Sequence, residues 1–162
     1  MDKDALVAMI KEKLGDMIVS IEEGKDLIHV EVSVDSIVEA ARRMKEMGFD
    51  HVKDVTAIDY PKENVIKIFY HASSYGNTDL SRYIVGIGYS IPRDRTSVPS
   101  LYYVWTTADF QEREVYEGFG IVFEGHPDMR PLLLAPPIAE KRPLRKDFVV
   151  KEEPIFKAPK KK

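Results

Sequence analysis

Apolar residues near the start of the chain recur at the spacing of one helix face. They are Leu6, Met9, Ile10 and Leu14, and Gly15 follows the last of them. Residues three and four positions apart lie on the same side of a helix, so this pattern predicts a short amphipathic helix that ends at Gly15. No long apolar run leading to a small-residue cleavage site accompanies it, so we do not expect a signal peptide.

A β-hairpin is expected next. Residues 17–22 and 27–32 are two β-rich runs that flank a polar turn containing Gly24. A second helix should follow, because Ser36 and Glu39 have the spacing of a capping box. Its apolar stripe ends before Gly48 and consists of Ile37, Ala40, Ala41, Met44 and Met47.

Three further β-rich runs come after this helix, at residues 51–58, 65–72 and 82–91. Turn-forming residues at 59–64 and 73–79 separate them. The order of elements predicts an α+β fold, with a small mixed or antiparallel sheet and helices on one face. We expect the core to be closed by about Ile91.

The remainder of the chain alternates polar loops with short structured pieces. Residues 92–99 are expected to form a loop, Ser100 to cap a short turn at 101–105, and a helix to begin near Thr107 and end at Gly118 or Gly120. Prolines recur from Pro127 onward and exclude a long helix or a central strand. The last fifth of the chain is therefore expected to be extended and to rest on another surface.

Composition limits the classes of function. The 162 residues are 44% hydrophobic, which fits one domain with a core, and the formal charge of −3 argues against a nucleic-acid binder. There is no cysteine, so disulfides, thiolate zinc sites and cysteine-ligated iron–sulfur clusters are excluded. No apolar run approaches the roughly 18–20 residues that span a bilayer. A charged fraction of 31% together with few amide side chains favours a thermophilic source.

Several groups could carry chemistry. Glu112, Glu114, His126 and Asp128 could form a small metal-dependent hydrolase site. Gly125 and Pro127 describe a tight turn more simply, however, so ligation or catalysis there is the minor alternative. The other histidines, His29, His51 and His71, lie on expected strands without paired ligand spacing, and Gly86 and Gly88 do not form a dinucleotide fingerprint. We therefore expect no metal, cofactor or catalytic residue in this chain.

The segment from Glu112 to Phe148 mixes charges, apolar residues, glycines and prolines and reads EREVYEGFGIVFEGHPDMRPLLL, then PLRKDF after a spacer. This segment resembles the signature of the thirty-kilodalton subunit of complex I, also known as its C subunit, and of the related subunit in archaeal membrane-bound nickel–iron hydrogenases. Asp54, Thr56, Ala57 and Asp59 resemble a further D-x-T-A-x-D landmark. The matching positions in the later part of the chain are Pro99, Ser100, Trp105, Ala108, Glu112 to Glu114, Tyr116, Phe119 to Ile121, Phe123, Gly125 to Asp128, Arg130 and Pro143 to Phe148.

The sequence also departs from the family pattern. Glu117 and Gly118 stand where the family usually has an aspartate and a bulky apolar residue, and Phe110 stands where tryptophan is common. A short, separate chain without cysteine suits an archaeal relative, such as a subunit of an energy-converting hydrogenase. The thirty-kilodalton subunit of an NADH:quinone oxidoreductase is the alternative.

The resemblance implies a scaffold subunit that holds no cofactor and docks on a hydrogenase-like large subunit (the D type of complex I), near an iron–sulfur small subunit. Iron–sulfur clusters, and nickel–iron in a hydrogenase, would belong to those partners, and the complex would lie at the cytoplasmic face of the membrane. Residues 1–125 would form the α+β domain and 126–162 a partner-binding tail, ordered at 143–150 and disordered at Lys160 to Lys162. The expected partner-binding residues are Glu112, Arg113, Glu114, Tyr116, Phe119, Phe123, His126, Asp128, Arg130, Arg142, Leu144, Arg145, Lys146, Asp147 and Phe148.

Overall fold

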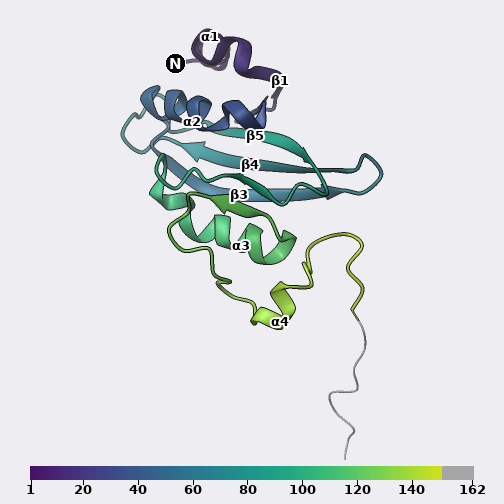
Figure 1. The fold of residues 1–162 in the computed structure, drawn as a ribbon. Helices are drawn as coiled ribbons and strands as arrows, with labels where there is room; N and C mark the ends of the chain where they lie inside the picture. The colour runs from purple at the N-terminus through teal and green to yellow at the C-terminus, as the bar shows by residue number, and fades with distance from the viewer. Residues whose placement is uncertain (151–162) are drawn as a thin grey trace, which may run out of the picture.

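The computed structural model describes residues 1–150 (Figure 1). A five-stranded sheet has the order β1-β2-β5-β4-β3. Strands β2 and β5 are parallel, whereas the other neighbouring pairs are antiparallel, so the sheet is mixed, which is one of the two predicted forms. The strands are β1 (Ile18–Glu23), β2 (Leu27–Val32), β3 (His51–Tyr60), β4 (Val65–Ser73) and β5 (Ile84–Pro92).

One face of the sheet is buried and the other is open. Along β4 the side chains alternate, so that Ile66, Ile68 and Tyr70 are fully buried while Lys67 and Phe69 lie partly in solvent. The helices pack on the buried face, as expected for this fold class. They are α1 (Lys3–Leu14), α2 (Ile37–Glu46) and α3 (Asp109–Phe119), with a short α4 (Pro136–Ala139) further along (Figure 1).

The start of α2 differs from the prediction. A 3-10 turn at Val34–Ser36 precedes the helix and leaves Ser36 in a helical backbone conformation. The Ser36 hydroxyl accepts a hydrogen bond from Ser33, and Glu39 pairs with Arg43, so the predicted capping box is wrong. The helix itself is present because its apolar stripe is buried. Ile37, Ala40, Ala41 and Met44 are inaccessible to solvent.

The core does not end at Ile91. Residues after it fill the space between the buried face of the sheet and α3, and Trp105 donates a 2.8 Å hydrogen bond to the carbonyl of Phe49. Part of the expected loop forms β6 (Ser97–Pro99), which pairs in parallel with β7 (Val122–Glu124). The additional buried residues are Val98, Leu101, Val104, Trp105, Ala108, Val115, Phe119, Ile121 and Phe123.

Helix α3 has the limits that the sequence indicates. A 3-10 turn at Thr106–Ala108 leads into it, and Gly120 caps its end with φ +72°, a left-handed conformation that favours glycine. None of the helices within residues 1–150 is long and apolar enough to cross a bilayer. The expectation of disorder at Lys160 to Lys162 falls outside the described residues.

Candidate partner-binding surface

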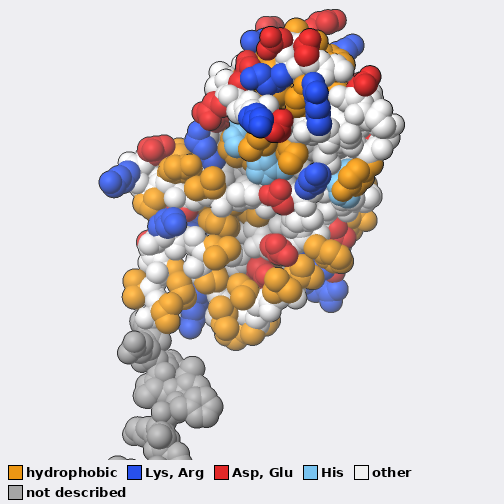
Figure 2. Space-filling view, turned by 180° about the vertical axis from the view of Figure 1, so that it is seen from behind, with side chains coloured by type: hydrophobic (Ala, Val, Ile, Leu, Met, Phe, Trp, Pro, Cys, Tyr) orange, Lys and Arg blue, Asp and Glu red, His pale blue; other side chains and the backbone are white. Residues whose placement is uncertain are grey.

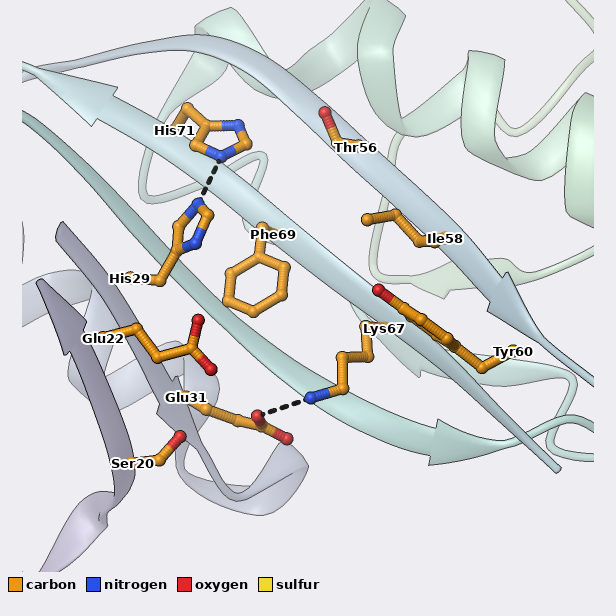
Figure 3. A pocket seen from close by; sticks show the side chains of 10 residues that line it. All are labelled: Ser20, Glu22, His29, Glu31, Thr56, Ile58, Tyr60, Lys67, Phe69 and His71. Carbon is orange, nitrogen blue, oxygen red and sulfur yellow. Dashed lines mark hydrogen bonds and ion pairs between the residues drawn. The ribbon is translucent and has the colours of Figure 1, made fainter. Parts of the chain in front are cut away.

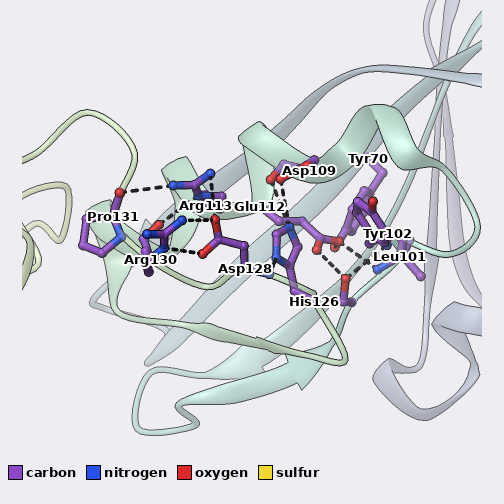
Figure 4. A network of polar contacts seen from close by, with 11 residues as sticks. Tyr70, Leu101, Tyr102, Asp109, Glu112, Arg113, His126, Asp128, Arg130 and Pro131 are labelled. Carbon is purple, nitrogen blue, oxygen red and sulfur yellow. Dashed lines mark hydrogen bonds and ion pairs between the residues drawn. The ribbon is translucent and has the colours of Figure 1, made fainter.

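Glu112 lies in the first turns of α3 and is completely buried. Its carboxylate accepts hydrogen bonds from Tyr70 Oη (2.8 Å), Ser100 Oγ (2.6 Å) and the Leu101 amide (2.8 Å), as Figure 4 shows in part. Burial raises the pKa of Glu112 above 4.5, although these three hydrogen bonds oppose the shift. Glu112 therefore joins β4, the loop after β6 and α3 inside the chain, and is not available to a partner or a substrate.

His126 closes the turn that the sequence predicted at Gly125 to Asp128. Its ring is fully buried, and Nδ1 accepts a 3.0 Å hydrogen bond from the Asp128 amide. Because that nitrogen accepts, the proton lies on Nε2, which is 3.3 Å from both the Asp109 carbonyl and its carboxylate. Tyr102 packs edge-on against the ring. The histidine holds the turn against the start of α3.

The arrangement does not support the hydrolase alternative. The Glu112 carboxylate already accepts three hydrogen bonds, and the His126 ring is fully buried, so neither is accessible to a substrate. Glu114, by contrast, is exposed to solvent. Within residues 1–150, no three histidine, cysteine, aspartate or glutamate side chains are grouped so that they could hold a metal ion.

Arg113 fixes the chain after this turn (Figure 4). It donates to the carbonyls of Arg130 (2.9 Å) and Pro131 (3.3 Å) and lies 3.6 Å from the Asp128 carboxylate. Asp128 also accepts two hydrogen bonds from Arg130, at 2.6 and 2.7 Å. The Arg130 guanidinium, with a smaller contribution from Arg113, lowers the pKa of Asp128 to about 2. The three charged residues therefore shape residues 128–131 within this chain.

Glu117, which departs from the family pattern, anchors a segment of the surface that the sequence does not point to. It is 4% exposed, and one carboxylate oxygen accepts hydrogen bonds from the amides of Leu132 (2.8 Å), Leu133 (3.0 Å) and Leu134 (3.0 Å). A carboxylate suits three converging N–H groups because charge-assisted hydrogen bonds are the stronger ones. This anchor presents Leu133, whose side chain is 73% exposed.

Residues 143–148, which we call the strap, are also held by the chain itself. Arg145 donates to the carbonyls of Phe119 (2.8 Å) and Arg93 (2.9 Å), and the Lys146 amide donates to Asp59 (2.8 Å). Arg93 grips the same Asp59 carboxylate through two hydrogen bonds, at 2.7 and 2.9 Å. Burial alone would raise the pKa of Asp59, but the bonds from Arg93 and Lys146 hold it below its usual value.

The glycines at the end of α3 make room for the strap. A Cβ at Gly118 would lie 2.6 Å from Leu144 Cδ1, and the Leu144 amide donates to the Gly118 carbonyl at 3.0 Å. A Cβ at Gly120 would overlap the side chain of Arg142. Gly118, where the family usually has a bulky apolar residue, therefore leaves the space in which Leu144 packs against α3.

The predicted partner-binding residues divide into three groups by their exposure. Glu112, Phe119, Phe123 and the His126 ring are buried in this chain, so the expectation that the two phenylalanines anchor a partner is wrong for the chain as it folds. Glu114, Arg130, Leu144, Lys146 and Asp147 are exposed. The rest are partly exposed, namely Arg113, Tyr116, Asp128, Arg142, Arg145 and Phe148.

The apolar side chains that are available to a partner are other residues than the two phenylalanines. Five large apolar residues in the last part of the described chain are at least 46% exposed, and two open grooves of about 360 and 560 Å³ lie beside them. Figure 2 shows hydrophobic side chains gathered on the lower part of the molecule, close to the end of the described chain. We call this set the apolar ridge, and its members are Leu133, Ile138, Leu144, Val149 and Val150.

Comparisons with known proteins identify the family. The chain is 35% identical over 134 residues to the C subunit of the NADH-quinone oxidoreductase of Moorella thermoacetica, covering 82% of this chain and 87% of that protein. It is 33% identical to the C subunit of the F(420)H(2) dehydrogenase of Methanosarcina mazei, covering 75% of each chain.

A solved structure of the membrane-bound sulfane sulfur reductase, an archaeal respiratory membrane complex, contains a similar chain. The similarity has a TM-score of 0.78 at 29% identity and covers 90% of this chain and 85% of that one. The family model of the respiratory-chain NADH dehydrogenase 30 kDa subunit matches residues 30–154. The chain therefore belongs to the family of the 30 kDa subunit of respiratory-chain NADH dehydrogenase.

Proposed function

We propose that this chain is a non-catalytic scaffold subunit of a membrane-bound, complex I-like respiratory complex. In this proposal it docks on a hydrogenase-like large subunit, close to an iron–sulfur small subunit, on the cytoplasmic side of the membrane. The electron carriers belong to those partners: iron–sulfur clusters and, in a hydrogenase, a nickel–iron centre. The chain has no redox centre of its own and meets the membrane only through other subunits.

The apolar ridge is the observation that carries the proposal. Leu133 and Leu144 are 73% and 58% exposed, yet their amides donate to the Glu117 carboxylate and to the Gly118 carbonyl, which fixes the backbone at both positions. Exposed apolar side chains gathered on one part of a molecule are typical of an interaction site (Figure 2). Because the backbone is already ordered, little conformational entropy is lost when a partner covers the ridge.

The parent complex is proposed to be an archaeal energy-converting nickel–iron hydrogenase or a close relative. The similarity to a chain of the archaeal sulfane sulfur reductase complex and to an F(420)H(2) dehydrogenase subunit supports this assignment. The thirty-kilodalton subunit of an NADH:quinone oxidoreductase is the second candidate, which the Moorella relative favours. The sequence of the large subunit of the same complex would distinguish the two, since nickel-ligand motifs are expected only in the hydrogenase.

Co-expression with that large subunit tests the proposal. A tagged wild-type chain should recover the large subunit, and Leu133→Ser should recover much less of it with unchanged thermal stability. Val19→Ser is the matched control, because Val19 is 66% exposed on β1, away from the ridge. Equal recovery by the two variants would contradict docking through the ridge, and failure of the wild-type chain to recover the large subunit would contradict the scaffold role.

A further inference from the structure

The open face of the sheet carries a feature that the docking role does not use. A depression of about 290 Å³ lies over this face, on the side opposite the helices (Figure 3). In Figure 2 histidine side chains appear in the upper part of the face among acidic and basic groups. The depression contains His29 from β2 and His71 from β4, with Phe69 beside them.

The sheet register brings the two histidines together over a glycine. Strand β5 lies between β2 and β4, and its Gly86 is the direct neighbour of both His29 and His71. A Cβ at position 86 would overlap the His29 ring and lie 3.0 Å from His71 Cδ2. Only glycine at this position leaves space for both rings to reach across the central strand and meet.

The rings meet through the nitrogens that metals use. His29 Nε2 and His71 Nε2 are 3.1 Å apart, and the centroid of the tilted Phe69 ring lies 4.8 Å from that of the His29 ring (Figure 3). His71 Nδ1 lies 3.0 Å from the Asp54 carboxylate, which also accepts a 2.6 Å hydrogen bond from Thr56. Because a carboxylate accepts, Nδ1 of His71 carries the proton, and its Nε2 presents a lone pair.

We propose that His29 and His71 bind one divalent transition-metal ion of the zinc class through their Nε2 atoms, with Asp54 as a positioning residue. Zinc–imidazole bonds are about 2.0–2.1 Å long, so two nitrogens 3.1 Å apart subtend roughly 100° at a shared ion. That angle lies between square and tetrahedral coordination. In the mutual hydrogen bond His29 Nε2 is the donor, because His71 Nε2 presents its lone pair, so His29 binds the ion as its other tautomer, with the proton transferred through water to Nδ1. Both Nε2 lone pairs then point at the ion, which replaces the mutual hydrogen bond.

Asp54 supplies the arrangement that supports many metal-binding histidines. A histidine ligand usually donates its other N–H to a carboxylate, which fixes the ring orientation and makes the coordinating nitrogen more basic. His71 and Asp54 already have this geometry, although they come from neighbouring strands. The residue types also fit, because imidazole ligands suit zinc, copper and nickel rather than calcium or magnesium.

The surrounding charges favour a cation. Glu22 on β1 is the cross-strand neighbour of His29, while Glu31 on β2 is paired at 3.1 Å with Lys67 on β4. No third histidine or carboxylate in the described chain completes a three-ligand group, so water fills the remaining positions.

As ligands, His29 and His71 would depart from the expectation that no histidine of this chain binds a metal. The site does not depend on the proposed docking, because the apolar ridge and the strap are built from other residues. The metal is not a redox centre in this proposal, so a zinc-binding chain and a scaffold role are compatible. Loss of the histidine pair is therefore expected to leave recovery of the large subunit unchanged.

Zinc titration of the purified full chain by isothermal calorimetry tests the proposal. The wild-type chain should bind one Zn²⁺ per molecule, and the double variant His29→Ala/His71→Ala should bind none while retaining its thermal unfolding midpoint in metal-free buffer. Asp54→Asn should weaken binding by about 10–100-fold without changing that midpoint. His51→Ala, which alters a strand histidine outside the pair, should bind as the wild type does.

Ring nitrogen spectra give an independent readout. Zn²⁺ should shift the Nε2 signals of His29 and His71 and leave those of His51 and His126 in place. Gly86→Ala should abolish the shifts, and if that variant does not fold, the histidine variants still decide the matter. The absence of stoichiometric binding by the wild type, or binding that persists in the double histidine variant, would overturn the proposal.

Discussion

Glu112→Ala is expected to destabilise the fold because it removes the acceptor of a buried network. Tyr70 Oη and the Leu101 amide are both buried donors to this carboxylate, whereas Ser100 is partly exposed and can bind water. A buried donor left without an acceptor costs about 1–3 kcal/mol, so the two together predict a loss of about 2–6 kcal/mol. In a domain of this size that corresponds to a decrease in the unfolding midpoint of roughly 4–24 °C.

Urea unfolding measures this loss directly. The free energy of unfolding should fall while its dependence on urea concentration stays unchanged, since the extent of burial is the same. The neighbouring exposed carboxylate gives the control: Glu114→Ala should change stability by no more than about 0.5 kcal/mol. Equal effects of the two substitutions would refute the reasoning that Glu112 ties α3 to the sheet.

The pH dependence gives a second test of the same residue. The pKa of Glu112 in the folded state lies above 4.5, the usual value that applies to the unfolded state. At any pH between the unfolded-state and folded-state pKa values, the folded state therefore binds the proton more tightly than the unfolded state does. The stability of the wild type relative to Glu112→Gln should therefore rise as the pH falls from neutrality through the folded pKa, and level off below about 4.5. A relative stability that falls over this range would contradict the assigned environment.

Three other substitutions probe different parts of the structure. Met44→Ala should cost about 2–5 kcal/mol in urea unfolding, because Met44 lies on the fully buried side of α2; a loss below about 0.5 kcal/mol would contradict its place in the core. Glu117→Ala should speed amide hydrogen exchange at residues 132–134 far more than exchange in the sheet, and unchanged exchange there would remove its role as the anchor of the ridge. Arg93 holds the pKa of Asp59 below its usual value of 3.8. The contribution of Asp59 to the stability of the fold is therefore complete above about pH 3.8 and is lost as the pH falls through the folded-state pKa. Asp59→Asn should therefore flatten the acid limb of stability, and an unaltered acid limb would contradict the pairing.

The sequence predicts those elements whose periodicity is long enough to be read locally. Helix α2 shows this, since its apolar positions recur over nearly three turns and all of them proved buried or partly buried. Strands β6 and β7 could not be predicted in the same way, because three residues are too few to show an alternation. Their pairing depends on Val98 and Phe123 filling the core, which is a tertiary effect.

The residues of the candidate surface could be identified only in part from the sequence. Phe119 and Phe123 have the chemistry of interface anchors, and only the packing of α3 on the sheet shows that they are internal. The strap is fixed by Asp59, which is 87 positions from Lys146, so no local pattern could indicate the contact. Glu117 could have been noticed as a family departure close to three consecutive leucines, although its hydrogen bonds could not.

The histidine pair illustrates the same limit. Ligand-spacing rules look for histidines close together in the sequence, whereas His29 and His71 are 42 residues apart. They meet because a parallel and an antiparallel neighbour of β5 both face Gly86. The sequence showed two strand histidines and a strand glycine, and only the strand order and register bring the three together.

Docking of the apolar ridge on a hydrogenase-like large subunit is the central claim, and site-specific crosslinking tests it most directly. A photoreactive amino acid at position 133 of the tagged chain should crosslink to the large subunit in the assembled complex, with the sites located by mass spectrometry. The same group at position 19 should give no such crosslink, because Val19 lies on β1 away from the ridge. Crosslinks to the large subunit from position 19 and none from position 133 would contradict the account.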